Sequence, residues 1–566
     1  MTTNQAAQIA DEHAAPLDLL LVNSTKSFAK RMAPNSAWLR FGTELAKKPG
    51  TVVGAGVGLV KEIGEIAIGR SERAPARGDQ RFRDPAWSGN PLLKRVEQSY
   101  LAACDAAETL YESADLSWRD AEQLRFALDN ILEGLSPTNN VLLNPLGWKA
   151  IIDTGGLSVY RGLRAFARDM STKPRVPSMV DPDAFHVGET TAATPGAVVF
   201  RTRMLEVIQY RPTTEQVSTT PLVVVPPVIN KYYVLDIAPG RSMVEHLLSR
   251  GHQVFMISWR NPKARHREWG MDAYAEAIIE VLAAVREISG APSTHIMAAC
   301  SGGILAAMVT ALLSSTGRGD LVSTLTLLVT VLDQSQAGVA SALVDREAAE
   351  SAIKSSAAKG YLEGAALSEM FAWLRPTDLV WRYVVNNYIQ GRTPAAFDVL
   401  FWNADSTNMT AALHRDMVRL GLDNLLVTPG EATLLGTPID LSKITCPSYV
   451  VGGINDHICP WQSTYRSAAL LGGDDATYVL STAGHIAALV NPPGNKKSSY
   501  RIGPVSRELS AEQWRQDIEP ESGSWWTAHA QWLSDHGDGL REAPENLGAP
   551  GFTPVAPAPG TYVLES

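Results

Sequence analysis

Cysteine is scarce in this sequence, with four residues among 566. The four positions contain no CxxC pair, and their irregular spacing fits neither a disulfide framework nor a zinc site built from paired cysteines. The sequence therefore predicts no metal site, and each cysteine has to be judged by its own surroundings. The positions are Cys104, Cys300, Cys446 and Cys459.

Long hydrophobic runs are also missing. The best apolar stretches, residues 51–59 and 325–332, are about half as long as the roughly 18 residues that a helix needs to cross a bilayer. The first residues carry neither the cationic nor the continuous apolar segment of a secretion signal. We therefore expect a cytoplasmic protein without a membrane span.

The composition has no excess of positive charge. Lys and Arg number 50 against 59 Asp and Glu, which gives a formal net charge of −9. This balance offers no overall attraction to nucleic acid or anionic lipid, so no nucleic-acid partner is expected. Hydrophobic residues at 45% and charged residues at 19% are typical of globular proteins and exclude a disordered chain or a coiled-coil rod.

Composition and periodicity divide the chain into six segments. A polar start, a Gly/Val stretch and an Arg/Pro/Gly-rich stretch predict a flexible arm, after which apolar spacings of three and four predict helices. The predicted segments are a flexible N-terminal arm (1–90), a helical N-terminal domain (91–195), two parts of an α/β core (196–336 and 435–542), a helical cap insertion (337–434) and a Pro/Gly-rich tail (543–566).

Short β-rich runs alternate with helical stretches through the core. Such alternation predicts a mostly parallel central sheet covered by helices on both faces. A helical insertion late in the sheet is the layout of an α/β-hydrolase fold with a cap, and this is the fold class that we predict. The expected strands are residues 222–225, 253–258, 295–299, 325–331, 448–451 and 477–480.

The sharpest motif places Cys300 between a predicted strand and a predicted helix. It corresponds to the G-x-S-x-G nucleophile elbow with cysteine as the nucleophile. The neighbours Ser301, Gly302 and Gly303 are small, as the strained turn requires, and Ala298 replaces one glycine of the ideal pattern. A cysteine at a helix N-terminus is a favoured thiolate, so the motif predicts a catalytic cysteine rather than a packed one.

An acid and a histidine follow the cysteine in the order of an α/β-hydrolase triad. Asp456 ends one late strand and His485 ends the next. We predict that His485 accepts the thiol proton and that Asp456 orients the imidazole or acts as a second base. His457 is the rival base, although its position beside Asp456 favours a role in bracing the loop. The other three cysteines, Cys104, Cys446 and Cys459, are predicted to be packing residues.

The residues resemble the polyhydroxyalkanoate synthases, specifically the single-subunit kind with a fused N-terminal domain. The resemblance covers nearly everything after about residue 90. The chain differs from the family at one position of the elbow, where the family usually has glycine and this chain has Ala298. The matching segments are residues 226–233, 257–262, the cysteine elbow, 386–388, 401–408, 484–486 with 491–494, and 523–526.

This resemblance implies an enzyme that polymerises (R)-3-hydroxyacyl-CoA into polyester and releases CoA, without a separate cofactor. It implies that Cys300 holds the growing chain as a thioester, that His485 deprotonates the thiol and that Asp456 helps to activate the 3-hydroxyl group. It also implies a cap that excludes water, a homodimer and association with polyester granules. One segment, 371–376, looks like the medium-chain branch and another, 406–409, like the short-chain branch, so chain-length preference stays open.

Further site residues are expected around the elbow. The oxyanion would be held by the backbone amide of Ser301 and by a second amide, at Val228 or Ile229, because the prolines before them have no amide hydrogen. Lys231 and Arg260 are candidates for the CoA phosphates, with structural ion pairs as the alternative.

Two other functions are weighed against the polymerase. A cysteine-dependent thioesterase or polyester depolymerase would use the same triad and differ only in water access. A non-catalytic protein that coats granules would tolerate Cys300→Ala, and the complete triad pattern argues against it.

Overall fold

The computed structural model describes residues 36–335, 346–374, 376–456 and 458–566. These residues form two compact units. The sheet unit holds Pro182–Ser368 and Ala396–Ser566, and the helical unit holds the described part of Ser24–Asp181 together with Glu369–Ala395.

The sheet unit is built on one mixed sheet in the order β15-β14-β13-β12-β7-β6-β4-β5-β2-β1-β17. The six strands from β13 to β5 run parallel, and the strands outside them are antiparallel. The bounds are β1 Gly196–Arg201, β2 Leu205–Tyr210, β4 Leu222–Val225, β5 Val254–Trp259, β6 Thr294–Ala299, β7 Val322–Leu328, β12 Ser448–Gly453, β13 Ala476–Ser481, β14 Ser499–Pro504, β15 Glu521–Ser522 and β17 Ala556–Pro557.

The parallel strands confirm the predicted fold class. Strands β4, β5, β6 and β12 are buried along their whole length, as expected for a parallel sheet covered on both faces. The antiparallel edge strands were not predicted. One reason is visible in β14, which carries Arg, Gly and Pro and is half-buried along most of its length, so it lacks the continuous apolar run of the inner strands.

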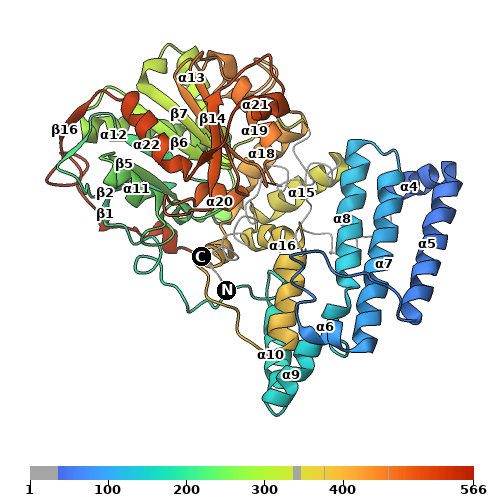
Figure 1. Ribbon diagram of the computed structural model, residues 1–566. Helices are drawn as coiled ribbons and strands as arrows, with labels where there is room; N and C mark the ends of the chain where they lie inside the picture. The colour runs from blue at the N-terminus through green and yellow to red at the C-terminus, as the bar shows by residue number, and fades with distance from the viewer. Residues whose placement is uncertain (1–35, 336–345, 375, 457) are drawn as a thin grey trace. The chain divides into compact units, whose positions relative to one another are not determined.

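Helices cover both faces of this sheet (Figure 1). The apolar side chains of one face form a core cluster with α11 (Met243–Ser249) and α22 (Trp525–Asp535). On the other face, α12 (Met271–Ser289) packs on α13 (Ser301–Ser315), and α19 (Trp461–Ala469) packs on β12.

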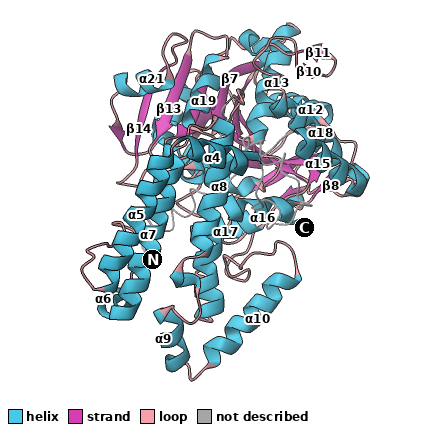
Figure 2. Cartoon of the chain, turned by 90° about the vertical axis from the view of Figure 1, so that its right-hand side faces the viewer, coloured by secondary structure: helices cyan, strands magenta, loops and turns pink. Residues whose placement is uncertain are grey.

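The helical unit contains no strand within its described residues (Figure 2). Two of its helices begin with an Asn-Pro pair, in which the asparagine side chain caps the first amides and proline fits the first turn: Asn90 caps α7 and Asn144 caps α9. The bounds are α4 Ser36–Lys47, α5 Pro49–Ala67, α6 Pro85–Gly89, α7 Pro91–Ser113, α8 Trp118–Gly134, α9 Pro145–Asp153 and α10 Leu157–Ser171, with π-helical turns at Thr377–Trp381 and Val384–Ile389.

Part of the expected flexible arm is helical. Residues 1–35 lie outside the described residues, but α4, α5 and α6 occupy most of 36–89. The glycines of α5 suggested a loop because each costs about 1 kcal/mol in a helix. The physical reason for the difference is tertiary packing, since α5 lies along α7 and α4 packs against both α5 and α8.

The expected cap insertion is mainly helical where it is described. It contains α15 (Arg346–Lys359), α16 (Gly364–Leu374), α17 (Asp398–Ala404) and α18 (Ala411–Leu422), and residues 336–345 and 375 lie outside the described part. Its middle segment, Glu369–Ala395, belongs to the helical unit and the rest to the sheet unit.

The expected tail is docked on the sheet unit. Just before the tail, strand β16 (Leu540–Glu542) pairs with β3 (Gln216–Ser218), and within the tail β17 pairs with β1. Tyr562 and Val563 are buried beyond it. Among the described residues, none of the helices is both long enough and apolar enough to pass through a membrane.

Candidate active site

Cys300 lies in the sharp turn between β6 and α13, at the edge of the sheet where the parallel strands end. Its backbone has a φ of 51° and a ψ of −122°, a conformation that side chains rarely adopt and that is typical of functional turns. Its amide donates a 3.0 Å hydrogen bond to the carbonyl of Leu328 on the neighbouring strand. The residue is 5% exposed. This is the backbone of a nucleophile elbow.

The small residues around Cys300 are required by close packing. A Cβ atom on Gly302 would lie 2.4 Å from the carbonyl oxygen of Pro226, and one on Gly303 would lie 2.0 Å from Oγ1 of Thr330. Ala298, by contrast, is completely buried inside β6. The sheet therefore accommodates the methyl group that replaces the usual glycine.

Two loops bring the acid and the histidine together. The loop after β12 donates amide hydrogen bonds to the end of β13 and to the loop after it, from Ile454 to Ser481 at 2.8 Å and from Asn455 to Ala483 at 3.2 Å. The approach is tight at Gly453, where a Cβ atom would lie 2.6 Å from the Ala483 carbonyl oxygen. Sequence reasoning placed both loops at strand ends, and their contact follows from the neighbouring positions of β12 and β13.

Asp456 uses both carboxylate oxygens. Its Oδ1 accepts hydrogen bonds from the amides of Ile458 at 2.9 Å and Cys459 at 2.8 Å. Its Oδ2 lies 2.6 Å from Nδ1 of His485, with both side chains fully buried. The carboxylate is thus fixed by its own turn and holds the imidazole in one orientation.

His485 begins helix α20 (His485–Leu489) and connects Asp456 to Cys300. Cys300 is among the groups next to His485 that raise the pKa of its imidazole. The structure therefore brings together the three residues that the sequence singles out, from the ends of β6, β12 and β13. His457, the rival base, lies outside the described residues.

The imidazole of His485 is a strong base in this site. Burial alone would lower its pKa, but the Asp456 carboxylate, which also hydrogen-bonds to the ring, and the neighbouring Cys459 and Cys300 raise the pKa of His485 well above its usual value. A histidine with a raised pKa holds a proton taken from a neighbouring thiol.

Cys459 is a member of this site that sequence reasoning assigned to packing. It is 1% exposed, and its Sγ lies within 4.8 Å of a ring nitrogen of His485. Burial raises the pKa of the Cys459 thiol, while His485 acts in the opposite direction. The sequence signal that could have found Cys459 is its spacing. Cys459 is the third residue after Asp456, and the turn that Asp456 caps brings this residue back toward the end of β12.

The predicted oxyanion donors are close to the elbow but differ in availability. The amide of Val228 donates to the Ser301 hydroxyl at 3.1 Å, so this amide is already used. The amides of Ser301 and Ile229 make no hydrogen bond to another described residue. The Ser301 hydroxyl, which the sequence analysis did not single out, links the elbow to the loop after β4.

Lys231 and Arg260, the candidates for CoA phosphates, contact the C-terminal segment. The Lys231 ammonium donates to the carbonyl oxygen of Glu565 at 2.6 Å. Arg260 pairs with the Glu565 carboxylate at 3.1 Å, and its guanidinium lies 3.8 Å from the centre of the Tyr562 ring. Burial lowers the pKa of Lys231, an effect opposed by Asp405 and Glu565. Arg260 thus has an ion pair and Lys231 a backbone partner in the C-terminal segment.

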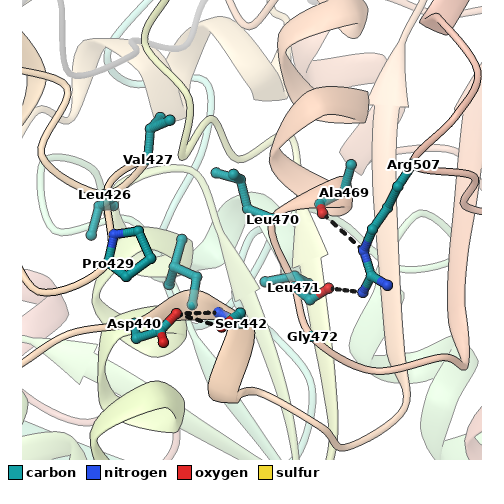
Figure 3. Close-up of a pocket in the computed structure, with 11 residues that line it drawn as sticks. Leu426, Val427, Pro429, Asp440, Ser442, Ala469, Leu470, Leu471, Gly472 and Arg507 are labelled. Atoms are coloured by element: carbon teal, nitrogen blue, oxygen red, sulfur yellow. Dashed lines mark hydrogen bonds between the residues drawn. The ribbon is translucent and has the colours of Figure 1, made fainter.

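A cavity of about 310 Å³ lies elsewhere in the sheet unit. Figure 3 shows Arg507 at its edge, donating to the carbonyls of Ala469 and Leu471. None of the predicted site residues lines this cavity, whose walls come from residues 426, 427, 429, 440–442, 469–472 and 507.

The arrangement can carry out acyl transfer through a covalent intermediate. A thiol at an elbow, a base with a raised pKa and a buried acid that orients it are the three parts of nucleophilic catalysis. Among the described residues, this is where all three parts meet.

Comparison with known proteins points to one family. The family described as "Poly-beta-hydroxybutyrate polymerase (PhaC) N-terminus" matches residues 78–247, and the one described as "alpha/beta hydrolase fold" matches residues 221–492. The two matches together span both units of the structure.

Several curated relatives resemble the chain over most of its length. "Poly(3-hydroxyalkanoate) polymerase 2" of Ectopseudomonas oleovorans is 43% identical over 505 residues, covering 89% of each chain. "Poly(3-hydroxyalkanoate) polymerase subunit PhaC" of Cupriavidus necator is 37% identical over 505 residues, covering 88% of this chain and 85% of the relative. "Poly(3-hydroxyalkanoate) polymerase" of Methylorubrum extorquens is 37% identical over 496 residues, covering 86% and 81%.

Proposed function

Because the chain belongs to the family of poly(3-hydroxyalkanoate) polymerases, we propose that it polymerises (R)-3-hydroxyacyl units, supplied as coenzyme A thioesters, and releases coenzyme A. The observation that carries the chemistry is the buried pair of Asp456 and His485, whose Oδ2 and Nδ1 atoms lie 2.6 Å apart, beside the Cys300 thiol, which helps to raise the pKa of the same imidazole.

The first step is acyl transfer to Cys300. Its Sγ attacks the thioester carbonyl while His485 takes the thiol proton, and the amides of Ser301 and Ile229 stabilise the oxyanion. The C–S bond to coenzyme A then breaks, and His485 returns its proton to the leaving thiolate. Donor and product are both thioesters, so the exchange is close to balanced in free energy, which suits a cysteine better than a serine.

The second step is ester formation. The 3-hydroxyl group of one acyl unit gives its proton to His485 and attacks the thioester carbonyl of the other, so that an ester forms and the Cys300 thiol is regenerated. Asp456 acts through His485 here, because both of its oxygens already accept hydrogen bonds. Water has to be excluded while the acyl-thioester persists.

The decisive experiment follows coenzyme A release and insoluble polyester together. Purified protein is incubated with (R)-3-hydroxybutyryl-CoA and, separately, with a longer (R)-3-hydroxyacyl-CoA, which also reports the chain-length preference. Cys300→Ala should abolish both signals, and Cys446→Ala, at the far end of β12, should retain them. Coenzyme A release with only free hydroxy acid would instead establish a thioesterase, the alternative that the same residues permit.

We also propose that the helical unit contacts the polyester granule in the cytoplasm. Its helix α10 exposes apolar side chains at Leu157, Tyr160, Leu163 and Phe166, each 49 to 65% accessible to solvent, and such a row is a typical hydrophobic contact surface. Replacing Leu163 and Phe166 by Ser should release the protein from isolated granules into the supernatant. Unchanged sedimentation with granules would contradict this surface.

A homodimer is proposed from the family resemblance alone. Sedimentation velocity of the purified protein, with and without substrate, tests it directly. A single species at the mass of one chain, 61.1 kDa, under both conditions would reject it.

A further inference from the structure

One group of potential metal ligands stands out among the described residues: Asp456, Cys459 and His485. Each offers one ligand atom, these atoms lie within 4.8 Å of one another, and all three residues are buried. The group combines a carboxylate, a thiol and an imidazole, and no step proposed for polymerisation uses the thiol of Cys459.

The position of Cys459 follows from the turn that Asp456 caps. The Asp456 carboxylate accepts a hydrogen bond from the Cys459 amide at 2.8 Å, and this turn brings the Cys459 thiol within 4.8 Å of a ring nitrogen of His485. On its other side Cys459 packs with Val331 and Ile458 in a small apolar cluster. The thiol is therefore held beside the imidazole and shielded from solvent.

The donor set is one that soft divalent cations prefer. Zn²⁺ takes thiolate sulfur at about 2.3 Å and imidazole nitrogen or carboxylate oxygen at about 2.0 to 2.2 Å, in a tetrahedron. A carboxylate paired with the histidine, as Asp456 is here, orients the imidazole and strengthens it as a ligand.

We propose that the active site contains a binding site for a thiophilic divalent cation, such as Zn²⁺ or Cd²⁺, formed by Cys459 and His485 with the carboxylate of Asp456. On binding, the Cys459 S–H bond breaks, its proton passes to solvent and the thiolate bonds to the cation. The bound cation withdraws the imidazole from Cys300, so the same ions act as reversible inhibitors. The binding step does not depend on which acyl transfer the site catalyses.

Cobalt provides the probe because thiolate-bound Co²⁺ has a charge-transfer absorption in the near ultraviolet that oxygen and nitrogen ligands do not produce. The full-length protein, without substrate and under anaerobic conditions, is titrated with Co²⁺, and Zn²⁺ is then added in competition. We expect the absorption to saturate at one equivalent and to disappear on addition of Zn²⁺.

Three variants locate the site. Cys459→Val and Cys459→Ser should each weaken binding at least tenfold and reduce the charge-transfer absorption, and His485→Gln should also weaken binding. Cys446→Val removes a thiol at the start of β12 and should bind as the unmodified protein does. Circular dichroism and thermal melts verify that each variant is folded, and the two Cys459 replacements guard against a packing defect in either one.

The proposal is overturned if the unmodified protein shows no saturable charge-transfer absorption, or if both Cys459 variants bind Co²⁺ as tightly as it does. Neither result bears on polymer formation, which is measured separately. In the polymerase assay, Zn²⁺ should inhibit at a concentration at least tenfold lower in the unmodified protein than in Cys459→Val, with recovery on addition of a chelator.

Discussion

The carboxylate of Asp456 carries two tasks at the scale of a single residue. One oxygen caps the turn that follows β12, and the other holds His485. A side chain with both tasks cannot be replaced by a neutral isostere without consequence, because asparagine keeps the shape but loses the charge that supports the imidazolium.

Asp456→Asn should therefore change both the rate and the pH dependence. The carboxylate raises the pKa of His485, so its removal should lower that pKa and shift the acidic limb of kcat/KM to lower pH. The maximum rate should fall by a factor of about 10² or more, since the imidazole loses its orienting partner. Coenzyme A release measured between pH 5 and pH 9 tests this, and an unshifted acidic limb would contradict it.

Gly303 is a second residue with little room for change. The Cβ of Gly303→Ala would lie 2.0 Å from Oγ1 of Thr330, and overpacking of this kind costs about 1 to 3 kcal/mol. We expect a lower free energy of unfolding and loss of activity, both partly restored when Thr330→Ala is added.

The matched control for Gly303→Ala is another helical glycine. Gly54 in α5 has no atom within 4 Å of the Cβ position, so Gly54→Ala should leave activity intact and stabilise its helix by up to about 1 kcal/mol. Chemical denaturation measures both free energies. Equal effects of the two substitutions would rule out the contact with Thr330 as the cause.

At the scale of an element, the C-terminal segment after β17 acts as a strap on the sheet unit. The fully buried Glu206 carboxylate accepts hydrogen bonds from the amides of Thr561 and Tyr562 at 2.9 and 3.0 Å and from the Thr561 hydroxyl at 2.8 Å. The same segment supplies Glu565 to the buried Lys231. Its removal would take these hydrogen bonds from Lys231 and from Glu206, which would keep, among the described residues, only its ion pair with Arg201.

Deletion of residues 561–566 should lower the free energy of unfolding by about 3 kcal/mol or more, because buried charges that lose their partners are costly. Urea denaturation measures the loss. Adding Glu206→Gln should recover part of it by removing one charge. A deletion that leaves the unfolding free energy unchanged would show that the strap does not stabilise the sheet unit.

At the scale of the whole molecule, one buried histidine joins two strands of the sheet and another joins the sheet to helix α22. His295 Nδ1 and His529 Nε2 lie 2.9 Å from the hydroxyls of Thr324 and Thr326 on β7. Burial lowers the pKa of His295 to about 3 and that of His529 well below its usual value, with nearby histidines acting in the same direction. Both side chains are neutral when folded.

A lowered pKa in the folded state means that the unfolded chain binds more protons below about pH 6.5. The stability that neutral His295 contributes is therefore complete above that pH and is lost as the pH falls toward 3. Between pH 7.5 and pH 5 the unmodified protein should lose about 2 kcal/mol more unfolding free energy than His295→Gln. All other titratable groups are the same in both proteins, so their contributions cancel in the difference between the two losses of unfolding free energy. Equal losses in urea titrations at the two pH values would refute the prediction.

The sequence predicts most of the sheet unit because its signals are local. Continuous apolar runs define strands such as β6, and small residues define the elbow at Cys300. The proximity of Asp456 to His485 was also accessible, since both end neighbouring late strands. The position of Cys459 could not be predicted, because it depends on a hydrogen-bonded turn. Helix α5 was not predicted because its packing on α7 outweighs the cost of its glycines.

The pairing of β1 with β17 has a consequence for biosynthesis. Ala197 is opposite Pro557, so the two strands are separated by most of the chain. At about 5 to 20 residues per second, a ribosome needs roughly 20 to 70 seconds to proceed from one to the other. During that interval the edge of β1 has no partner, and unpaired edges invite aggregation. Each nascent chain therefore passes through a period in which protection by chaperones would be of most use.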